Sequence, residues 1–291
     1  MTRVDYLSDV LALTRIPNRD VSQPQRVIEL LVSGLQGALD LVDPGTLTPP
    51  KEIFDAARCD MKSWLADGIK VVCVTEDQYP RELVQVREAP ALLYYEGNLA
   101  SNDRAIAVVG SRKASQRALN NASRISRELV SAGYSVAAGL ASGIDTAAHW
   151  AALEAGGRTV AVMGTGIGQT YPSVNTQLRH AIAGNNGLVL TQFEPDQGPT
   201  RYSFPMRNAV MSGYCLATII VEAGEHSGTR IQARKALQHG KNVILLAPVV
   251  QQNKWAYEIA NTPGVYVVKD LDQLRGTLEE VEQNLKILAA V

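Results

Sequence analysis

The chain has 291 residues, of which 46% are apolar and 20% are charged, with 28 basic and 29 acidic side chains. This composition is ordinary for a globular protein, and the length accommodates one large domain and a smaller appendage. A run of about 18 apolar residues is absent, which excludes a transmembrane helix, and the first ten residues lack the pattern of a signal peptide. We therefore expect a cytoplasmic protein with no membrane partner. The three cysteines lack the spacing of a metal site, so no metal is expected.

Residues 1–67 are predicted to form a small helical domain. Apolar residues recur with helical spacing over 7–11 and 27–35, and prolines punctuate the turns between these segments. Val71 then begins the first strand, so residues 68–291 are assigned to a second, larger domain.

From residue 105 onward, predicted strands and helices alternate. The strand segments are continuous apolar runs, as expected for parallel strands that are covered on both faces. The helices between them imply right-handed βαβ units. The sequence therefore predicts an α/β fold with a Rossmann-like, doubly wound parallel sheet. Strands are expected at 105–109, 134–138, 159–163, 188–191, 216–221, 242–247 and 265–268, and helices at 119–129, from 145 to 155, from 173, at 229–238 and at 271–288.

Glycines directly follow four of the predicted strands. The carboxyl ends of parallel strands share one edge of the sheet, where open α/β folds bind their ligands. Backbone N–H groups in glycine loops and at helix starts suit phosphates. The G-x-G-x-x-G fingerprint is absent and no acid ends the second strand, so a dinucleotide cofactor is not expected. The glycines of this predicted crevice are Gly110, Gly139, Gly143, Gly164, Gly166, Gly224 and Gly228.

Basic residues gather in two segments although the net charge is only −1. Residues 101–135 and 200–241 each hold six basic side chains against two acids. A local basic face attracts phosphates whatever the total charge, although solvated helix faces explain the same pattern equally well. Arg112 and Arg207 are the favoured phosphate contacts. Candidate stacking platforms for bases are Tyr171, Tyr202 and Phe204, whereas Asp145 and His149 are expected to serve the fold as a helix cap and a packing residue.

Five segments carry a more specific signal. Gly110-Ser111-Arg112 follows a strand, residues 138–149 read AGLASGIDTAAH, Tyr171-Pro172 forms a YP turn, residues 204–208 read FPMRN, and residues 221–229 read VEAGEHSGT. In this order, the segments resemble the motifs of the DNA-processing protein A family, called DprA or Smf. The resemblance extends over about residues 69–248.

The resemblance implies a cytoplasmic homodimer that binds single-stranded DNA and loads a RecA-type recombinase during DNA uptake and recombination, with no catalytic residue. The chain departs from the family pattern at Ala209, at Val249 and over Arg230-Ile231-Gln232, and it ends without an obvious winged helix. These departures leave recombinase loading open. The predicted binding residues are Gly110, Ser111, Arg112, Lys113, Gly139, Ser142, Gly143, Gly164, Gly166, Arg207, Asn208, Ser227, Gly228 and Thr229.

Two other functions remain open at this point. A phosphoribohydrolase-like enzyme of related fold would need a catalytic glutamate where this chain has Gln232. A module that senses a small nucleotide would share the same crevice. A basic track that continues beyond the crevice over Lys113, Arg117 and Arg124 would favour an oligonucleotide ligand over both alternatives.

Overall fold

The fold is organised around one mixed β-sheet. The computed structural model describes residues 2–16, 27–28, 31 and 51–289, and these ranges contribute nine strands in the order β1-β2-β6-β5-β4-β3-β7-β8-β9. The β1–β2 and β2–β6 pairs are antiparallel, and the other pairs are parallel. The strands are β1 (Lys70–Cys73), β2 (Leu92–Gly97), β3 (Ala105–Gly110), β4 (Ser135–Ala138), β5 (Thr159–Val162), β6 (Leu188–Thr191), β7 (Ala217–Glu222), β8 (Asn242–Leu246) and β9 (Val265–Val268).

The strand order reverses between β3 and β7. From β3 the chain winds through β4, β5 and β6 toward one edge, and from β7 it winds through β8 and β9 toward the other. The predicted doubly wound α/β fold is therefore confirmed. The reversal places the carboxyl ends of β3 and β7 next to each other, where Gly110 pairs with Glu222. In open α/β sheets this switch point is the expected ligand site.

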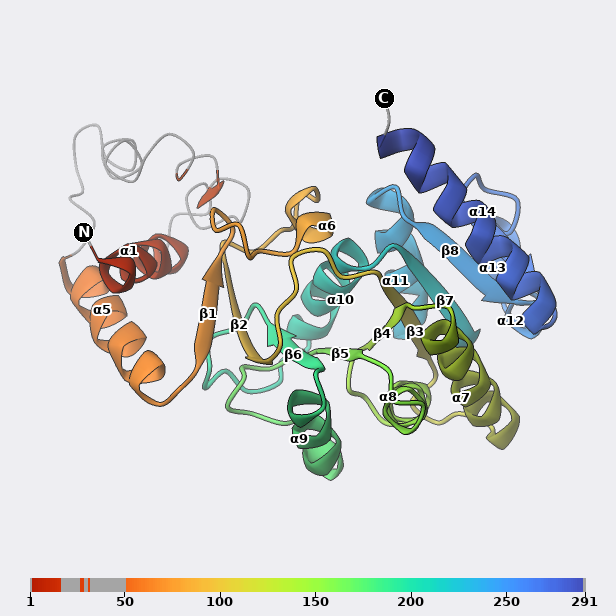
Figure 1. The fold of residues 1–291 in the computed structure, drawn as a ribbon, viewed down its shortest axis with the longest axis horizontal. Helices are drawn as coiled ribbons and strands as arrows, with labels where there is room; N and C mark the ends of the chain where they lie inside the picture. The colour runs from red at the N-terminus through yellow and green to blue at the C-terminus, as the bar shows by residue number, and fades with distance from the viewer. Residues whose placement is uncertain (1, 17–26, 29–30, 32–50, 290–291) are drawn as a thin grey trace.

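Helices cover both faces of the sheet. α7, α8 and α9 lie on one face, and α10 and α11 lie on the other (Figure 1). β4, β5 and β6 are buried along their whole length, which accounts for their continuous apolar sequence. None of the helices in the described ranges has the length and apolar character needed to cross a bilayer. The helices are α1 (Arg3–Arg15), α5 (Lys51–Ala66), α6 (Arg81–Val84), α7 (Gln116–Ser131), α8 (Ile144–Glu154), the 3₁₀ turn Ser173–Asn175, α9 (Thr176–Gly184), α10 (Ser203–Tyr214), α11 (Gly228–Gln238), α12 (Ala247–Gln252), α13 (Lys254–Ile259) and α14 (Leu271–Ala289).

The N-terminal helices pack at the β1–β2 end of the sheet, away from α12–α14 (Figure 1). Arg15 in α1 forms ion pairs with Asp60 in α5 at 2.7 Å and with Glu194 beyond β6 at 2.6 Å. The Trp64 ring meets the buried Tyr94 ring edge-on at 5.5 Å. The helical character predicted for this region is confirmed for α1 and α5, whereas most of the predicted 27–35 helix lies outside the described residues. The domain boundary at residue 67 stays a prediction.

The start of α7 is tied to the end of β7. Ser115 caps α7 by accepting a hydrogen bond from the Ala118 N–H. The Glu222 carboxylate accepts from the Ser115 N–H at 3.0 Å and from the Ser115 hydroxyl at 2.6 Å. Glu222 therefore fixes the loop that carries Arg112 and Lys113, and within the described ranges its carboxylate forms no ion pair.

Arg207 in α10 joins the ends of two strands from inside the protein. Its Nη1 donates to the Gly139 carbonyl after β4 at 2.5 Å and to the Val162 carbonyl of β5 at 2.8 Å. The residue is only 6% exposed. A Cβ at Gly139 would lie 1.7 Å from Nη1, so this glycine makes room for the guanidinium and not for a ligand. The sequence pattern does not predict α10 as a helix, so Arg207 was expected to contact phosphate and its buried position was not predicted.

His149 is a buried neutral side chain of α8. Thr159 Oγ1 donates its hydrogen to the Val136 carbonyl, so His149 Nδ1 donates to Thr159 Oγ1 at 2.7 Å. Burial lowers the pKa of His149 to about 3, and the charge of Arg207 acts in the same direction. The predicted packing role is confirmed, because His149 is completely buried.

We expect Arg207→Met to destabilise the fold strongly. The change removes three hydrogen bonds of a buried charged group, two of them to strand-end carbonyls, which corresponds to about 3–5 kcal/mol. Arg201→Met is the matched control, since Arg201 is exposed and stacks on the Tyr202 ring, and it should change stability by at most about 0.5 kcal/mol. Urea unfolding measures both, and equal midpoints for the two variants would contradict the strand-joining role.

Candidate nucleic-acid interface

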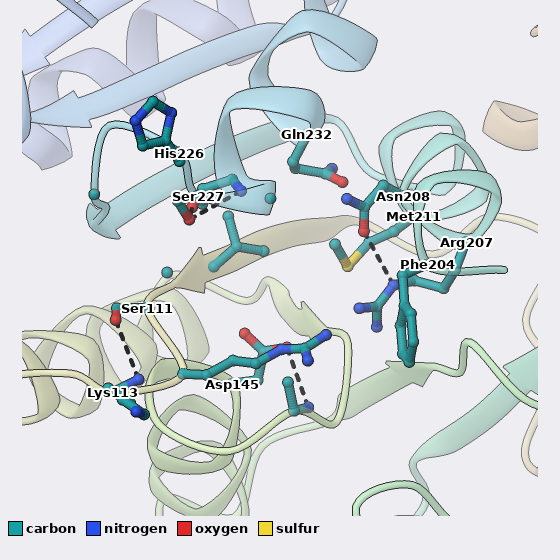
Figure 2. A pocket seen from close by; sticks show the side chains of 17 residues that line it. Ser111, Lys113, Asp145, Phe204, Arg207, Asn208, Met211, His226, Ser227 and Gln232 are labelled. Carbon is teal, nitrogen blue, oxygen red and sulfur yellow. Dashed lines mark hydrogen bonds between the residues drawn. The ribbon is translucent and has the colours of Figure 1, made fainter. Parts of the chain in front are cut away.

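A cavity of about 560 Å³ opens at the switch point between β3 and β7. Its walls come from the loops after these two strands, from the start of α11 and from the inner side of α10 (Figure 2). This is the edge at which the sequence places the ligand. The lining residues are Val109, Gly110, Ser111, Arg112, Lys113, Ala141, Asp145, Phe204, Arg207, Asn208, Met211, Gly224, His226, Ser227, Gly228, Thr229 and Gln232.

The first turn of α11 supplies a backbone donor to the cavity. Ser227 caps the helix by accepting a hydrogen bond from the Thr229 N–H at 3.2 Å, and the Ser227 and Thr229 hydroxyls hydrogen-bond to each other. A Cβ at Gly224 or Gly228 would meet no atom within 4 Å, so the space beside both residues is open. Because the Arg230 N–H donates to the Ser227 carbonyl at 3.1 Å, the Gly228 N–H is the first-turn donor that has no partner in the described ranges. It stands at the positive end of the helix dipole, which suits an anion.

The loop after β3 supplies two exposed cations. The Lys113 N–H donates to Ser111 Oγ at 3.1 Å, which shapes the turn. The Arg112 guanidinium lies over the Phe204 ring, 5.0 Å from its centroid. Within the described ranges, neither Arg112 nor Lys113 forms an ion pair with an acid. Both positive charges are therefore available to a ligand.

Asp145 is the one carboxylate among the lining residues. It lies in the first turn of α8 but accepts hydrogen bonds from the Gly139 N–H at 2.9 Å and the Ala141 N–H at 3.3 Å. Burial raises the pKa of Asp145, and the positive charges of Arg207 and Arg112 oppose that shift. Asp145 therefore supports the loop after β4, and the predicted helix-cap role is wrong, because Gly143 occupies the N-cap position of α8.

The structure brings together nine of the predicted site residues and leaves five outside the cavity lining. Gly143 has φ +82°, and a Cβ there would lie 2.3 Å from the Ser111 carbonyl oxygen, so this glycine is required by close packing of two loops. The glycines of the loops after β4 and β5 therefore support the carboxyl edge of the sheet by packing, and they do not line the cavity. Those outside the lining are Gly139, Ser142, Gly143, Gly164 and Gly166, and those within it are Gly110, Ser111, Arg112, Lys113, Arg207, Asn208, Ser227, Gly228 and Thr229.

Met211, His226 and Gln232 line the cavity but were not predicted as site residues. Met211 was missed because α10 was missed. Gln232 follows Thr229 by three positions, so helical spacing places both on one side of α11, and that spacing was the available signal.

Basic residues continue from the cavity along α7. Arg117 and Asn121 line a small groove against the end of β7 and α12, and Asn121 and Arg124 line the next groove, beside Lys269. Both arginines are exposed and, in the described part of the chain, neither forms an ion pair. At the other side of the cavity mouth, the exposed Tyr171 ring lies 5.7 Å from the Phe204 ring.

Comparison with known proteins gives a consistent result. Residues 70–273 match the family model described as DNA recombination-mediator protein A. The chain is 39% identical over 178 residues to the DNA processing protein DprA of Streptococcus pneumoniae, covering 60% of this chain and 61% of that protein. It is 32% identical over 202 residues to Protein Smf of Escherichia coli, covering 69% and 53%. The matched region thus spans about half to three-fifths of these relatives.

Solved structures agree in fold. The structure of DprA from Streptococcus pneumoniae superposes with a TM-score of 0.71 at 27% identity, over 93% of this chain and 96% of that one. DNA processing protein A from Helicobacter pylori, described as having a unique single-stranded DNA binding mode, superposes with a TM-score of 0.64 at 23% identity, over 73% and 96%. The latter likeness supports the fold alone. The chain is similar to DprA and Smf relatives, and the family model matches its residues 70–273. The chain therefore belongs to the DNA recombination-mediator protein A family.

Proposed function

We propose that this protein binds single-stranded DNA in the switch-point cavity and acts in DNA processing and recombination. One observation carries the proposal: Arg112 and Lys113, without acid partners in the described ranges, stand in one cavity with the Gly228 N–H at the start of α11. Cations together with a helix N-terminus suit a phosphate group. The names of the relatives, which are DNA-processing proteins, support the same ligand.

The grooves along α7 give a strand a path beyond the cavity. Arg117, Asn121 and Arg124 recur at helical spacing and line successive grooves that lead away from Lys113. Each exposed arginine adds a possible phosphate contact. A path of this length supports an oligonucleotide over a mononucleotide as the ligand.

Aromatic rings at the cavity mouth suit unpaired bases. Phe204 is held under Arg112 and beside Tyr171, and Tyr202 is 63% exposed. Every base has a π-face, so stacking on such rings is tolerant of sequence. In duplex DNA these faces are already covered by neighbouring bases.

The chemistry of the cavity favours binding over catalysis. The hydrolase alternative needs a carboxylate at the position of Gln232, and a carboxamide cannot act as a general base there. Asp145, the one lining carboxylate, is engaged by two backbone N–H groups. A catalytic role therefore has no free carboxylate among the lining residues.

We also propose a cytoplasmic homodimer that cooperates with a RecA-type recombinase. The support for a dimer is β9, which is the edge strand of the described sheet and contains Val267, 40% exposed. Strands β7 and β8 cannot supply the interface, because they are internal strands that helices cover. Light scattering at tens of micromolar should give twice the monomer mass of 31.4 kDa, and a monomeric mass would argue against the dimer.

The protein should bind single-stranded DNA more tightly than duplex DNA of the same length. The cavity and its aromatic mouth accept unpaired bases, whereas a duplex offers only its phosphates. Fluorescence anisotropy titrations with one labelled strand, alone and annealed to its complement, measure the difference. Equal affinity for the two forms would refute the proposed mode of binding.

Arg112→Ala should weaken binding to all single-stranded sequences alike, because phosphate contacts carry no base information. The expected loss is about tenfold to a hundredfold, and the slope of log affinity against log salt should become shallower by about 0.7. Arg127→Ala is the matched control, since Arg127 lies on α7 but pairs with Glu154 at 2.9 Å. If the Arg112 variant melts normally and keeps both affinity and salt slope, the cavity is not the DNA site.

A further inference from the structure

Two carboxamide side chains line the cavity from neighbouring helices. Gln232 lies on the buried side of α11, and Asn208 lies on α10 next to Arg207 (Figure 2). Gln232 is 1% exposed, and its Oε1 has no hydrogen-bond partner among the described residues. Buried polar atoms are nearly always paired. An unpaired oxygen in a cavity wall therefore points to a ligand group that donates to it.

The hydrogen bonds of each amide decide which atom is left for the ligand. Gln232 Nε2 donates to Thr218 Oγ1 on β7 at 3.4 Å, which leaves Oε1 as an acceptor. Asn208 Oδ1 accepts from Arg207 Nε at 3.1 Å, which leaves Nδ2 as a donor. The wall thus offers one acceptor and one donor, beside the apolar side chains of Val109 and Met211.

The position of Gln232 relative to the anion site fits one nucleotide. Gln232 follows Gly228 by four residues, so it lies about 6 Å further along the helix axis than the Gly228 N–H at the start of α11. A phosphate held by that helix start and by Arg112 would leave its base to point inward. The apolar flanks suit the faces of the base, and the two amides suit its edge.

We propose that one unpaired base of the bound strand enters the cavity, donates an N–H to Gln232 Oε1 and accepts a hydrogen bond from Asn208 Nδ2. This inference rests on the DNA-binding function proposed above. The Watson–Crick edge of a base carries an N–H next to an acceptor, and this edge is free only in a single strand. Gln232 is therefore a determinant of the discrimination between single-stranded and duplex DNA.

Thymine analogues test the contact in the unmodified protein. A hexamer of N3-methylthymidine lacks the N–H that Gln232 would accept, and we expect it to bind about three- to tenfold more weakly than the thymidine hexamer, as for one neutral hydrogen bond. A deoxyuridine hexamer, which keeps the N3–H, should bind like thymidine. Equal binding of the methylated and unmethylated hexamers would overturn the inference.

Gln232→Leu separates the hydrogen bond from the bulk of the methyl group. This variant should lose about the same factor for the thymidine hexamer and should no longer distinguish the methylated one, while its salt slope stays unchanged because no phosphate contact is lost. Gln238→Leu, at the exposed end of the same helix, is the control and should bind like the unmodified protein. Thermal melts check that both variants fold.

The outcomes distinguish the two levels of the proposal. If the unmodified protein binds none of the hexamers and no longer single strand, the DNA-binding function itself is overturned. If the unmodified protein binds the thymidine hexamer, but N3-methylation lowers the affinity of the Gln232→Leu variant by the same factor as that of the unmodified protein, the effect of the methyl group is steric. Base reading by Gln232 is then overturned, while DNA binding stands.

Discussion

The buried guanidinium of Arg207 is the interaction on which the geometry of the cavity depends. Strands β4 and β5 end at the carboxyl edge of the sheet with carbonyl groups that face Arg207. Its Nη1 donates a hydrogen bond to each of them. The planar fork of arginine makes several such bonds at once, which the point charge of a lysine cannot reproduce. Because Arg207 belongs to α10, the same contact sets the position of Phe204, Asn208 and Met211. The position of the α10 wall of the cavity therefore depends on the hydrogen bonds that Arg207 makes to the strand ends.

Much of this architecture can be predicted from local sequence, because continuous apolar strands and glycine-ended helices are local signals. The strands β3 to β9 from Ala105 to Val268 and the helices α8, α11 and α14 were predicted within one residue for this reason, whereas the predicted 119–129 helix covers only the middle of α7. Helix α10 was not predicted, since its FPMRN sequence offers no amphipathic repeat and begins with a proline-containing turn. Because α10 was not predicted, Arg207 looks like a surface cation in the sequence.

Charge pattern alone could not separate the ligand-facing cations from the structural ones. The two basic segments contain Arg104, Arg127, Lys235 and Lys241, which pair with glutamates, and also Arg112 and Lys113, which do not in the described ranges. Only the folded chain shows which glutamate forms an ion pair with which arginine or lysine, because most of these pairs join residues far apart in sequence. The sequence also cannot distinguish the glycines that line the cavity from those that pack against other parts of the protein. Gly139 and Gly143 face other parts of the protein, whereas Gly224 and Gly228 face open space.

The carboxylate of Glu222 has a consequence for the rate of association. By accepting both hydrogen bonds from Ser115, it fastens the β7 end of the cavity to the first turn of α7, so the two sides are joined before any ligand arrives. A cavity assembled in this way requires no closing motion of these two loops. In the proposed mode of binding, the slow step in capture then belongs to the flexible strand, which must present a suitable stretch of backbone and base to a rigid receptor.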